Sequence, residues 1–357
     1  MKRLYVAYGD DAKNMARQLV EAVDPAKGLK RDALIALKPN LVVAKDWRSG
    51  ATTNPAICEA VIEYFKERGF SRIRIVESAW VGDSTQRAYR VCGYEALSER
   101  YGVELIDVKK DRYEVRESGG FKTEISHSAL ETDCLVNLPL IKGHCQTRMT
   151  CALKNMKGLI SDREKRRYHT LGLHEPIARL NTMIHPTLTI ADGIWTDPGF
   201  EEGGNPVRGN VMAAGDDSVL IDAFAARRLG LDPHSVGYIR LAEQYGIGSA
   251  GLDAAEIVEL GGVRTETAAA EGVPEAVASR IDVRGACSAC YASLVSALMT
   301  LGEAAGNEPV CIGQDFRGQR GKLGCGNCTA KFEHCIKGCP PKAEDIVQYF
   351  KSYKERS

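Results

Sequence analysis

The sequence lacks any long apolar run, and none of its apolar stretches approaches the roughly 18 residues that a membrane-spanning helix needs. It also lacks the pattern of a signal peptide. The start, from Met1 to Asp11, reaches paired acidic residues before an apolar region can form. We therefore expect a cytoplasmic protein with no membrane partner.

An excess of charge of one sign is missing as well, because Lys+Arg and Asp+Glu both number 47. Such a chain has no overall field that attracts nucleic acid or an anionic surface. The phosphate-binding pattern Gly-x-x-x-x-Gly-Lys-Ser/Thr is absent too, so nucleoside triphosphates have no sequence support. We expect no nucleic-acid partner, and any function based on charge has to come from a local cluster.

What the sequence does contain is a regular alternation of short apolar runs with amphipathic stretches. Its 357 residues suffice for about two domains. In the first 140 residues the predicted strands are Leu4 to Tyr8, Ala33 to Leu37, Arg72 to Val76, Val103 to Val108 and Cys134 to Leu138. The predicted helices run from Asp10 or Asp11 to Val23, from Asn54 to Arg68, and from Asp83 or Ser84 to Arg100. This alternation is typical of a doubly wound, mostly parallel α/β sheet.

The second half continues the alternation and then changes composition. Further strands are predicted at Thr187 to Ala191 and Val211 to Ala214, and further helices at Asp217 to Leu229 and Ser235 to Tyr245. The stretch from Gly261 to Asp282 is a predicted linker. Beyond it, a smaller α/β unit is predicted with strands Ile281 to Val283 and Pro309 to Gly313 and helices Tyr291 to Ala305 and Lys342 to Tyr353. We predict an α/β domain of residues 1–265 and a C-terminal cysteine-rich domain of residues 276–357.

Cysteine is abundant and clustered. Of 12 cysteines, seven lie in the last 71 residues. Without a signal peptide, and with closely spaced pairs, ligation of a metal by thiolates is favoured over disulfide bonds. Six of the seven lie in the motifs Cys287-Ser-Ala-Cys290, Cys325-Gly-Asn-Cys328 and Cys335-Ile-Lys-Gly-Cys339-Pro340-Pro341.

Four thiolates can hold a [4Fe-4S] cluster or, alternatively, a zinc ion. A proline directly after the last cysteine, before a predicted helix, favours the cluster because it is typical of bacterial ferredoxins. The spacing differs from that of ferredoxin, since Cys328 and Cys335 are seven residues apart instead of three. We predict that the metal ligands are Cys287, Cys290, Cys328 and Cys339, with Cys325 and Cys335 as alternates.

Residues 142–167 are strongly basic, with a net charge of +6 in an otherwise neutral chain. The segment follows a predicted strand, and open α/β sheets bind their ligands at the carboxyl ends of strands. A charge run is usually a solvated face, and the stretch from Arg163 to Arg167 fits that interpretation. The residues Lys142, His144, Lys154 and Asn155 are instead interleaved with glycine and apolar residues, which indicates a site for a carboxylate or a phosphate.

Other polar residues end neighbouring strands. Lys38-Pro39-Asn40 and Glu77-Ser78 follow the second and third predicted strands, so they should project from the same sheet edge as Lys142. We predict that the catalytic residues are Lys142, His144 and Lys154 and that the substrate-binding residues are Lys38, Asn40, Glu77, Asn155, Lys157 and Asp192. Lys38, Lys142 and Lys154 should converge, and a bound anion should relieve their repulsion.

Two histidines flank the basic segment. His169 and His174 are candidates for acid–base or ligand duty, although a lone histidine more often has a structural role.

Several of these motifs together resemble the domain of unknown function 362 family. They are Lys38-Pro39-Asn40-Leu41, Asn137-Leu138-Pro139, Lys142-Gly143-His144, Lys154-Asn155-Met156-Lys157-Gly158, Asp192-Gly193 and Ala214-Gly215-Asp216-Asp217. The resemblance covers about residues 30 to 250. It implies an α/β fold, and because members often carry an iron-sulfur module it also implies a cluster, for which Gly338-Cys339-Pro340-Pro341 is the signature here. It implies no particular reaction. A fold-level similarity to nickel-dependent lactate racemases is a further expectation, which transfers no chemistry.

The leading hypothesis is a [4Fe-4S] oxidoreductase or electron-transfer protein that acts on a small anionic substrate or cofactor and exchanges electrons with a redox partner protein. The second hypothesis is a non-redox isomerase or lyase in which a zinc ion or a cluster is structural. The third is a metal-stabilised binding or accessory protein without catalysis.

Overall fold

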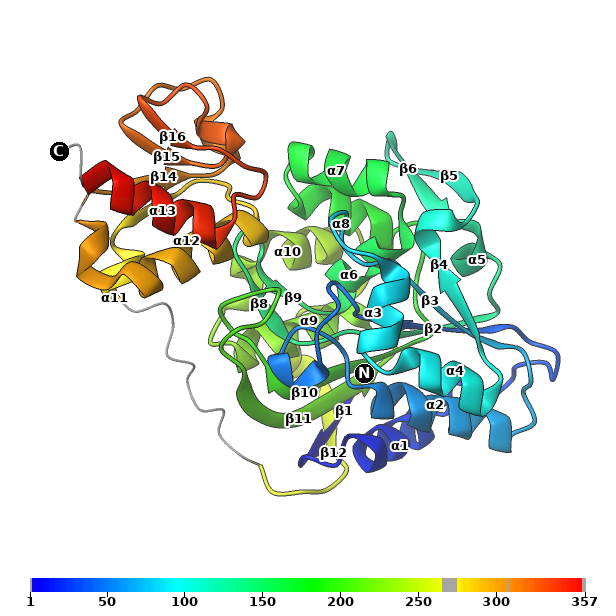
Figure 1. Ribbon diagram of the computed structural model, residues 1–357. Coiled ribbons are helices and arrows are strands. Elements are labelled where there is room, and N and C mark those ends of the chain that lie inside the picture. The colour runs from blue at the N-terminus through cyan, green and yellow to red at the C-terminus, as the bar shows by residue number, and fades with distance from the viewer. Residues whose placement is uncertain (1, 265–274, 307, 355–357) are drawn as a thin grey trace.

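The computed structural model describes residues 2–264, 275–306 and 308–354. The larger part is an eight-stranded sheet, and a smaller sheet lies near the C-terminus (Figure 1). The large sheet has the order β12-β1-β11-β10-β7-β2-β3-β4. Its strands are β1 (Arg3–Tyr8), β2 (Ile35–Pro39), β3 (Ile73–Glu77), β4 (Glu104–Asp107), β7 (Cys134–Leu138), β10 (Leu188–Thr196), β11 (Val207–Gly215) and β12 (Glu256–Glu259). Only β11 runs antiparallel to its neighbours, so the predicted mostly parallel α/β sheet is confirmed.

Helices cover both faces of this sheet because strand residues alternate between two cores. Ile35 and Leu37 belong to one core and Ala36 to the other. The first face is covered by α1 (Ala12–Val23), α2 (Pro55–Glu67), α3 (Thr85–Val91) and α4 (Tyr94–Tyr101). The second face is covered by α5 (His127–Leu130), α6 (Ala152–Asn155), α7 (Asp162–Leu171), α8 (His174–Asn181), α9 (Ser218–Arg228) and α10 (Gly237–Gln244), with the short 3-10 turn η3 (Met156–Leu159).

One predicted helix is divided in two. The stretch from Asp83 or Ser84 to Arg100 forms α3 and α4, which are separated at Cys92 and Gly93. Gly93 has a φ of 84°, a left-handed conformation that glycine adopts without strain and that ends a helix.

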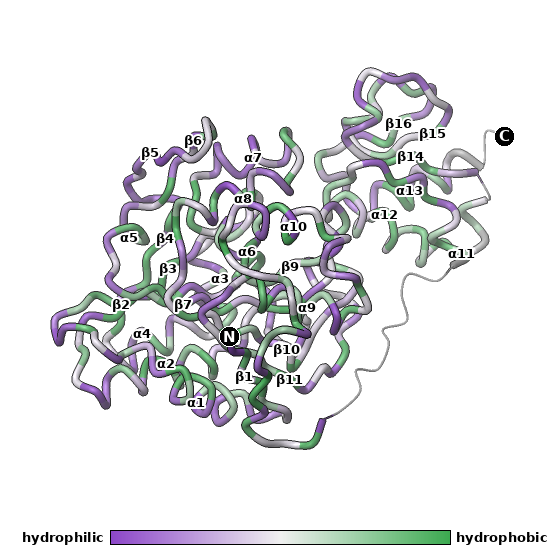
Figure 2. Tube along the Cα trace, turned by 180° about the vertical axis from the view of Figure 1, so that it is seen from behind, coloured by the Kyte–Doolittle hydropathy of each residue, from purple (hydrophilic) through white to green (hydrophobic). Residues whose placement is uncertain are grey.

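Two hairpins were not predicted. β5 (Tyr113–Ser118) pairs with β6 (Phe121–Ser126), and this hairpin is mainly hydrophilic on the outside of the protein (Figure 2). β8 (Lys142–His144) pairs with β9 (Arg148–Thr150) inside the basic segment. Shorter 3-10 turns are η1 (Trp47–Ser49), η2 (Val108–Lys110), η4 (Pro233–Ser235) and η5 (Leu252–Ala254).

The C-terminal unit is a four-stranded parallel sheet with its own apolar core. Its strands are β13 (Ile281–Val283), β14 (Val310–Ile312), β15 (Leu323–Cys325) and β16 (His334–Ile336). Its helices are α11 (Glu275–Ala278), α12 (Ser288–Leu301) and α13 (Ala343–Lys354), with the turns η6 (Gly302–Ala305), η7 (Gln314–Phe316) and η8 (Asn327–Thr329). The central part of the predicted linker, residues 265–274, lies outside the described residues.

The C-terminal unit contacts the β8–β9 hairpin of the larger unit. The Gln146 side-chain amide donates to the Gly285 carbonyl oxygen at 3.1 Å, and the Cys145 thiol donates to the Ala286 carbonyl oxygen at 3.0 Å. The rings of Phe200 and Tyr291 also pack together, with centroids 6.2 Å apart. These contacts bring the cysteine-rich loops to the carboxyl end of the large sheet. Among the described helices, none is long and apolar enough to cross a bilayer.

Candidate functional site

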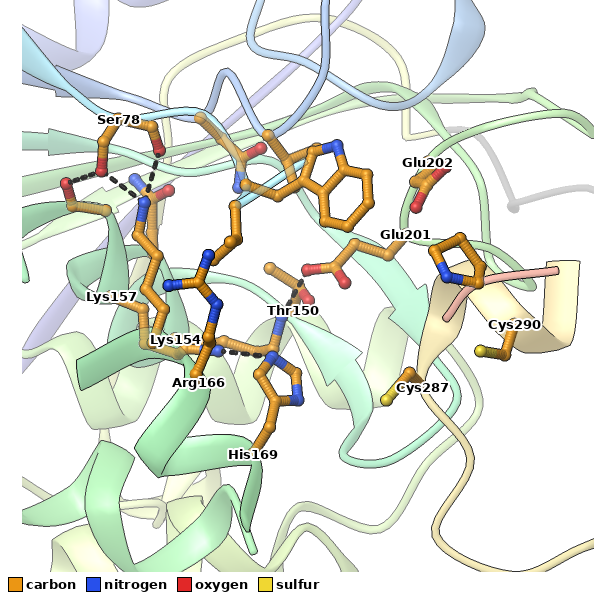
Figure 3. A pocket seen from close by; sticks show the side chains of 18 of the residues that line it. Ser78, Thr150, Lys154, Lys157, Arg166, His169, Glu201, Glu202, Cys287 and Cys290 are labelled. Carbon is orange, nitrogen blue, oxygen red and sulfur yellow. Dashed lines mark hydrogen bonds and ion pairs between the residues drawn. The ribbon is translucent and has the colours of Figure 1, made fainter. Parts of the chain in front are cut away.

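A cavity of about 490 Å³ lies where the two units meet. One side is lined by thiols and the other by amines, guanidinium groups and an imidazole. Figure 3 shows Cys287 and Cys290 on one side of the view, Ser78 and Lys157 on the other, and Arg166, His169 and Glu201 between them. The wall includes the apolar side chains Val42, Trp80 and Val81. The volume is in the range of small-molecule sites.

The carboxyl ends of β2, β3 and β7 are joined by buried polar groups. The Lys38 Nζ donates to Glu77 Oε2 at 2.5 Å and to the Pro39 carbonyl oxygen at 2.7 Å. Asn155 Nδ2 donates to Asn137 Oδ1 at 2.8 Å, and Asn155 Oδ1 lies 3.4 Å from the Lys38 Nζ. The predicted residues Lys38, Glu77 and Asn155 therefore come together, and Glu77 neutralises Lys38 without a bound anion.

Lys142 is completely buried but does not line the cavity. Its Nζ donates to the Ala51 carbonyl oxygen at 2.7 Å and to Asn40 Oδ1 at 3.2 Å. Burial lowers the pKa of Lys142 to about 7, because the charged amine loses its hydration there. Lys142 thus positions Asn40, which does line the cavity.

Glu201 links the two other predicted catalytic residues. Lys154 forms an ion pair with Glu201 Oε1, and His144 Nε2 lies 3.0 Å from Glu201 Oε2. The backbone N–H groups of Gln146 and Thr147 both donate to His144 Nδ1, so the proton of the neutral ring is on Nε2. Burial lowers the pKa of His144 to about 4. His144 is therefore a neutral imidazole beside the Glu201 carboxylate, and Glu201 neutralises the charge of Lys154. The expected convergence of three unpaired lysines is not what the protein contains.

The charged stretch on α7 has two faces. Arg163 is exposed and pairs with Glu124, and the half-buried Arg167 pairs with the buried Glu164. Lys165 is buried, and its Nζ donates to the Ala79 carbonyl oxygen at 2.8 Å and to Ser78 Oγ at 2.6 Å.

Arg166 lines the cavity and points into it (Figure 3). Among the residues that the structure describes, no carboxylate lies within ion-pair distance of its guanidinium group. The interpretation of this stretch as a solvated face fails for the buried Lys165, and it holds for Arg163 and Arg166, which are exposed, although Arg166 also lines the cavity.

Lys157 and His169 form an amine–imidazole pair at the cavity. The Lys157 Nζ lies 3.3 Å from His169 Nε2. Burial and the neighbouring charges of Lys154 and Lys165 lower the pKa of Lys157 to about 7. The positive charge of Lys157, followed by burial, holds the pKa of His169 well below its usual value.

Asp192 lies away from the cavity lining. It is buried, and it accepts hydrogen bonds from the backbone N–H groups of Ile194 at 3.0 Å and Asn54 at 3.1 Å. Burial raises the pKa of Asp192 to about 6. Its contacts hold the start of α2 against β10, which is a structural role. His174, one of the two candidate histidines, likewise accepts from the backbone N–H of Tyr238 and does not line the cavity.

The cysteines divide into two groups. Cys287, Cys290 and Cys339 line the cavity. Their charges and that of Cys328 act on one another: Cys328 and Cys339 raise the pKa of the Cys287 thiol after burial, and Cys287 and Cys339 contribute to the raised pKa of Cys290. Cys287 also occupies the N-cap position of α12, without a side-chain capping hydrogen bond.

Cys325 and Cys335 lie on the neighbouring strands β15 and β16. Cys325 is in the apolar core of the C-terminal unit with 1% of its surface exposed. The thiol of Cys335 contacts Thr329 Oγ1 and the Gly326 carbonyl oxygen, each at 3.6 Å. In the described part of the chain, no set of three or more histidine, cysteine or acidic side chains is arranged as a metal site. The cluster and its ligands remain predictions.

Several residues of the cavity carry no signal in the sequence. Glu201 lies in a loop rich in glycine, and Trp80 follows β3 without a motif. Gln314 and Arg317 come from the loop after β14; Gln314 Nε2 lies 3.4 Å from Cys287 Sγ, and hydrogen bonding to Cys328 raises the pKa of Arg317. Only the tertiary structure brings these residues to the cysteines.

Comparison with known proteins finds similarity to a protein family, a curated relative and a solved structure, among others. A family described as "Domain of unknown function (DUF362)" matches residues 35–227, which is more than half of the chain. The thylakoid-associated protein sll1697 of Synechocystis sp. is 24% identical over 257 residues, which are 66% of this chain and 77% of that protein. The lactate racemase apoprotein from Thermoanaerobacterium thermosaccharolyticum has a TM-score of 0.41 and 15% identity, over 86% of this chain and 68% of that chain. The similarity to the lactate racemase apoprotein is too low to support a conclusion about function.

Proposed function

We propose that this chain, which belongs to the DUF362 family, is a [4Fe-4S] oxidoreductase or electron-transfer protein with a binding site for a small anionic molecule beside the cluster. The observation that carries the proposal is the cavity itself. Its wall contains both Cys287, Cys290 and Cys339 and the cationic side chains Lys157 and Arg166. A ligand there lies next to the thiols.

The donor set fits a cluster. The charges of Cys287, Cys339, Cys325 and Cys328 all contribute to the raised pKa of Cys290, so this coupling does not choose among the candidates. Cys287, Cys290 and Cys339 line the cavity, whereas Cys325 lies in the apolar core and the Cys335 thiol contacts a hydroxyl and a carbonyl oxygen. Cys287 is the N-cap residue of α12, and the N–H groups at this helix N-terminus favour negative charge. Thiolate-bound clusters of this kind supply single electrons. Gln314 and Arg317 donate toward the same sulfur atoms.

The anion site depends on positive charge that the protein leaves without a carboxylate. Five cationic side chains and three carboxylates line the cavity. Glu77 is engaged by Lys38, and Glu201 by Lys154 and His144. Lys157 and Arg166 have no carboxylate partner among the described residues. A carboxylate or phosphate group would supply the missing negative charge through charge-assisted hydrogen bonds.

The Lys157–His169 pair favours a second candidate function. An amine and an imidazole in contact can exchange protons with a ligand, as a non-redox isomerase or lyase requires. In that case the cysteines would hold a structural cluster or zinc ion.

Anaerobic purification followed by metal analysis tests the proposal. We expect about four iron and four sulfide per chain, with a visible absorption that dithionite bleaches and air restores. Inorganic phosphate or pyruvate added to the same protein should lower the reduction potential, because an anion beside the cluster disfavours the extra electron. Zinc at about one per chain with negligible iron would refute the cluster. Iron with a potential that neither anion changes would refute the adjoining anion site.

A further inference from the structure

A line of hydrogen bonds connects the cavity to the loop that precedes Cys287. Lys157 Nζ lies 3.3 Å from His169 Nε2, His169 Nδ1 lies 3.0 Å from Gln146 Oε1, and Gln146 Nε2 lies 3.1 Å from the Gly285 carbonyl oxygen. A carbonyl oxygen only accepts, so the Gln146 amide nitrogen faces Gly285 and the amide oxygen faces His169. His169 therefore carries its proton on Nδ1. Its Nε2 is an unprotonated acceptor that faces the Lys157 amine.

The Lys157 amine differs from the other lysines around the cavity. Lys154 is paired with Glu201, Lys38 is paired with Glu77, and Lys165 is held by the oxygens of Ser78 and Ala79. Within the described residues, the only polar partner of the Lys157 Nζ is His169. Its pKa of about 7 leaves about half of the amine unprotonated near neutral pH. A desolvated lysine beside other cations, with a base in contact, is the arrangement that makes an amine nucleophilic.

Arg166 is the second group of this site that can bind a ligand, beside the Lys157 amine. Its guanidinium group points into the cavity that Lys157 and His169 also line (Figure 3). A guanidinium group without a carboxylate partner binds a ligand carboxylate through two parallel hydrogen bonds. A ligand that satisfies both groups has a carboxylate for Arg166 and an electrophilic carbon for Lys157.

We propose that Lys157 is a covalent binding site for a small oxoacid, which it holds as an imine while Arg166 binds the carboxylate. The Lys157 nitrogen forms a bond to the carbonyl carbon, and the carbonyl π bond breaks. His169 Nε2 accepts one proton from the nitrogen and passes it to the oxygen, which gives a carbinolamine. The nitrogen then loses its second proton to His169 Nε2, which returns it to the hydroxyl group, and this group leaves as water as the C=N bond forms. An amine and a carbonyl thus give an imine and water, with no oxidant or reductant. The inference rests on the anion site of the proposed function and is independent of the cluster.

Reductive trapping tests this inference on the full-length, anaerobically purified protein. Pyruvate or glyoxylate is added with sodium cyanoborohydride, and the digested protein is analysed by mass spectrometry. We expect a carboxyethyl or carboxymethyl group on Lys157 well before the exposed lysines react. Propionate has the carboxylate and lacks the carbonyl, so it should compete and reduce the labelling.

Matched variants identify the residue and its base. Lys157→Arg should abolish the early label, while Lys122→Arg, at an exposed position on β6, should leave it unchanged. His169→Gln should slow labelling by at least about tenfold, since general-base contributions are of that order or larger. Gln146→Leu should slow it as well, because nothing then holds the proton on His169 Nδ1. The labelling rate should rise with pH through about 7, where free lysine would need a pH near 10.

The outcomes separate the two proposals. Early labelling spread over exposed lysines, or the same labelling in Lys157→Arg, would overturn the covalent site. Pyruvate that binds and shifts the potential without any label on Lys157 would overturn this inference and leave the anion site standing. A label on Lys157 in protein that contains no iron or sulfide would support this inference and refute the cluster.

Discussion

The ammonium group of Lys38 lies 2.5 Å from the carboxylate of Glu77, and both side chains are almost completely withdrawn from solvent. They come from adjacent parallel strands, β2 and β3, at their carboxyl ends. The same amine also reaches Asn155, which lies 117 residues further along the chain. A charged pair that is buried in this way connects the sheet to the loops that form the cavity.

Removal of one partner of the Lys38–Glu77 pair should destabilise the folded protein. Glu77→Leu should lower the free energy of unfolding by about 3 to 5 kcal/mol, because it leaves the Lys38 charge buried without compensation. Urea unfolding followed by tryptophan fluorescence measures this, since all three tryptophans lie in residues 2–264. The double variant Lys38→Met/Glu77→Leu should recover part of the loss. A loss below about 1 kcal/mol in Glu77→Leu would contradict the buried pair.

The cysteine ligands can be assigned by substitution. We expect Cys287→Ser, Cys290→Ser, Cys328→Ser and Cys339→Ser each to lose most of the iron and the visible absorption. Cys325→Ser and Cys335→Ser should keep both, because these thiols pack in the core or against Thr329. Cys311→Ser, on β14 of the same unit, is the control for general damage. Full iron content in Cys328→Ser together with loss in Cys325→Ser would reverse the assignment.

Arg166 should carry much of the affinity for anions. Arg166→Ala should weaken the binding of pyruvate or inorganic phosphate by about 1.5 to 3 kcal/mol, the usual contribution of a charge-assisted hydrogen bond. Arg163→Ala on the same helix is a matched control, because Arg163 is exposed and paired with Glu124. Calorimetry on the two variants gives the comparison. Equal affinities would place the anion elsewhere.

Lys142→Ala should lower the stability of the protein and not its affinity for anions. The Lys142 amine donates to Ala51 and Asn40 and does not line the cavity. We expect the variant to lose stability, because the carbonyl oxygen of Ala51 loses its donor and a void replaces the side chain. Urea unfolding should show this loss at a pH where the wild type is stable. A loss of anion affinity with unchanged stability would restore Lys142 to the binding site.

His144 should contribute to the pH dependence of the free energy of unfolding. Its pKa is about 4 in the folded protein and about 6.5 when unfolded, so below pH 6.5 the unfolded state binds more protons. This contribution is present above pH 6.5 and is lost as the pH falls toward 4. Between pH 7 and pH 5 it amounts to about 2 kcal/mol. His144→Gln should therefore lose less stability than the wild type over this interval, as measured by urea unfolding at both pH values. An equal loss in both proteins would contradict the buried, neutral imidazole.

The strand–helix alternation and the parallel sheet could be predicted because they depend on local patterns. β7 and β13 have the predicted bounds, and β1, β2 and β3 agree within two residues. Apolar periodicity, N-caps and glycine positions act over a few residues, and these are visible in one sequence. β15 and β16 were missed because each has only three residues in a loop rich in glycine and cysteine, where no period can be seen.

By itself, the sequence determined which residue types carry the chemistry: the clustered thiols, the basic segment and the polar residues that end the strands. Which of these charges are neutralised was decided only by the tertiary structure. Glu201 reaches Lys154 and His144 from a loop that the basic segment does not contain, whereas Lys157 and Arg166 receive no such partner among the described residues. Ion pairs and hydrogen bonds act over a few ångströms in space, between residues that can be more than a hundred positions apart in the chain. No local pattern records those distances, so only the folded chain distinguishes a neutralised lysine from one that can bind a ligand.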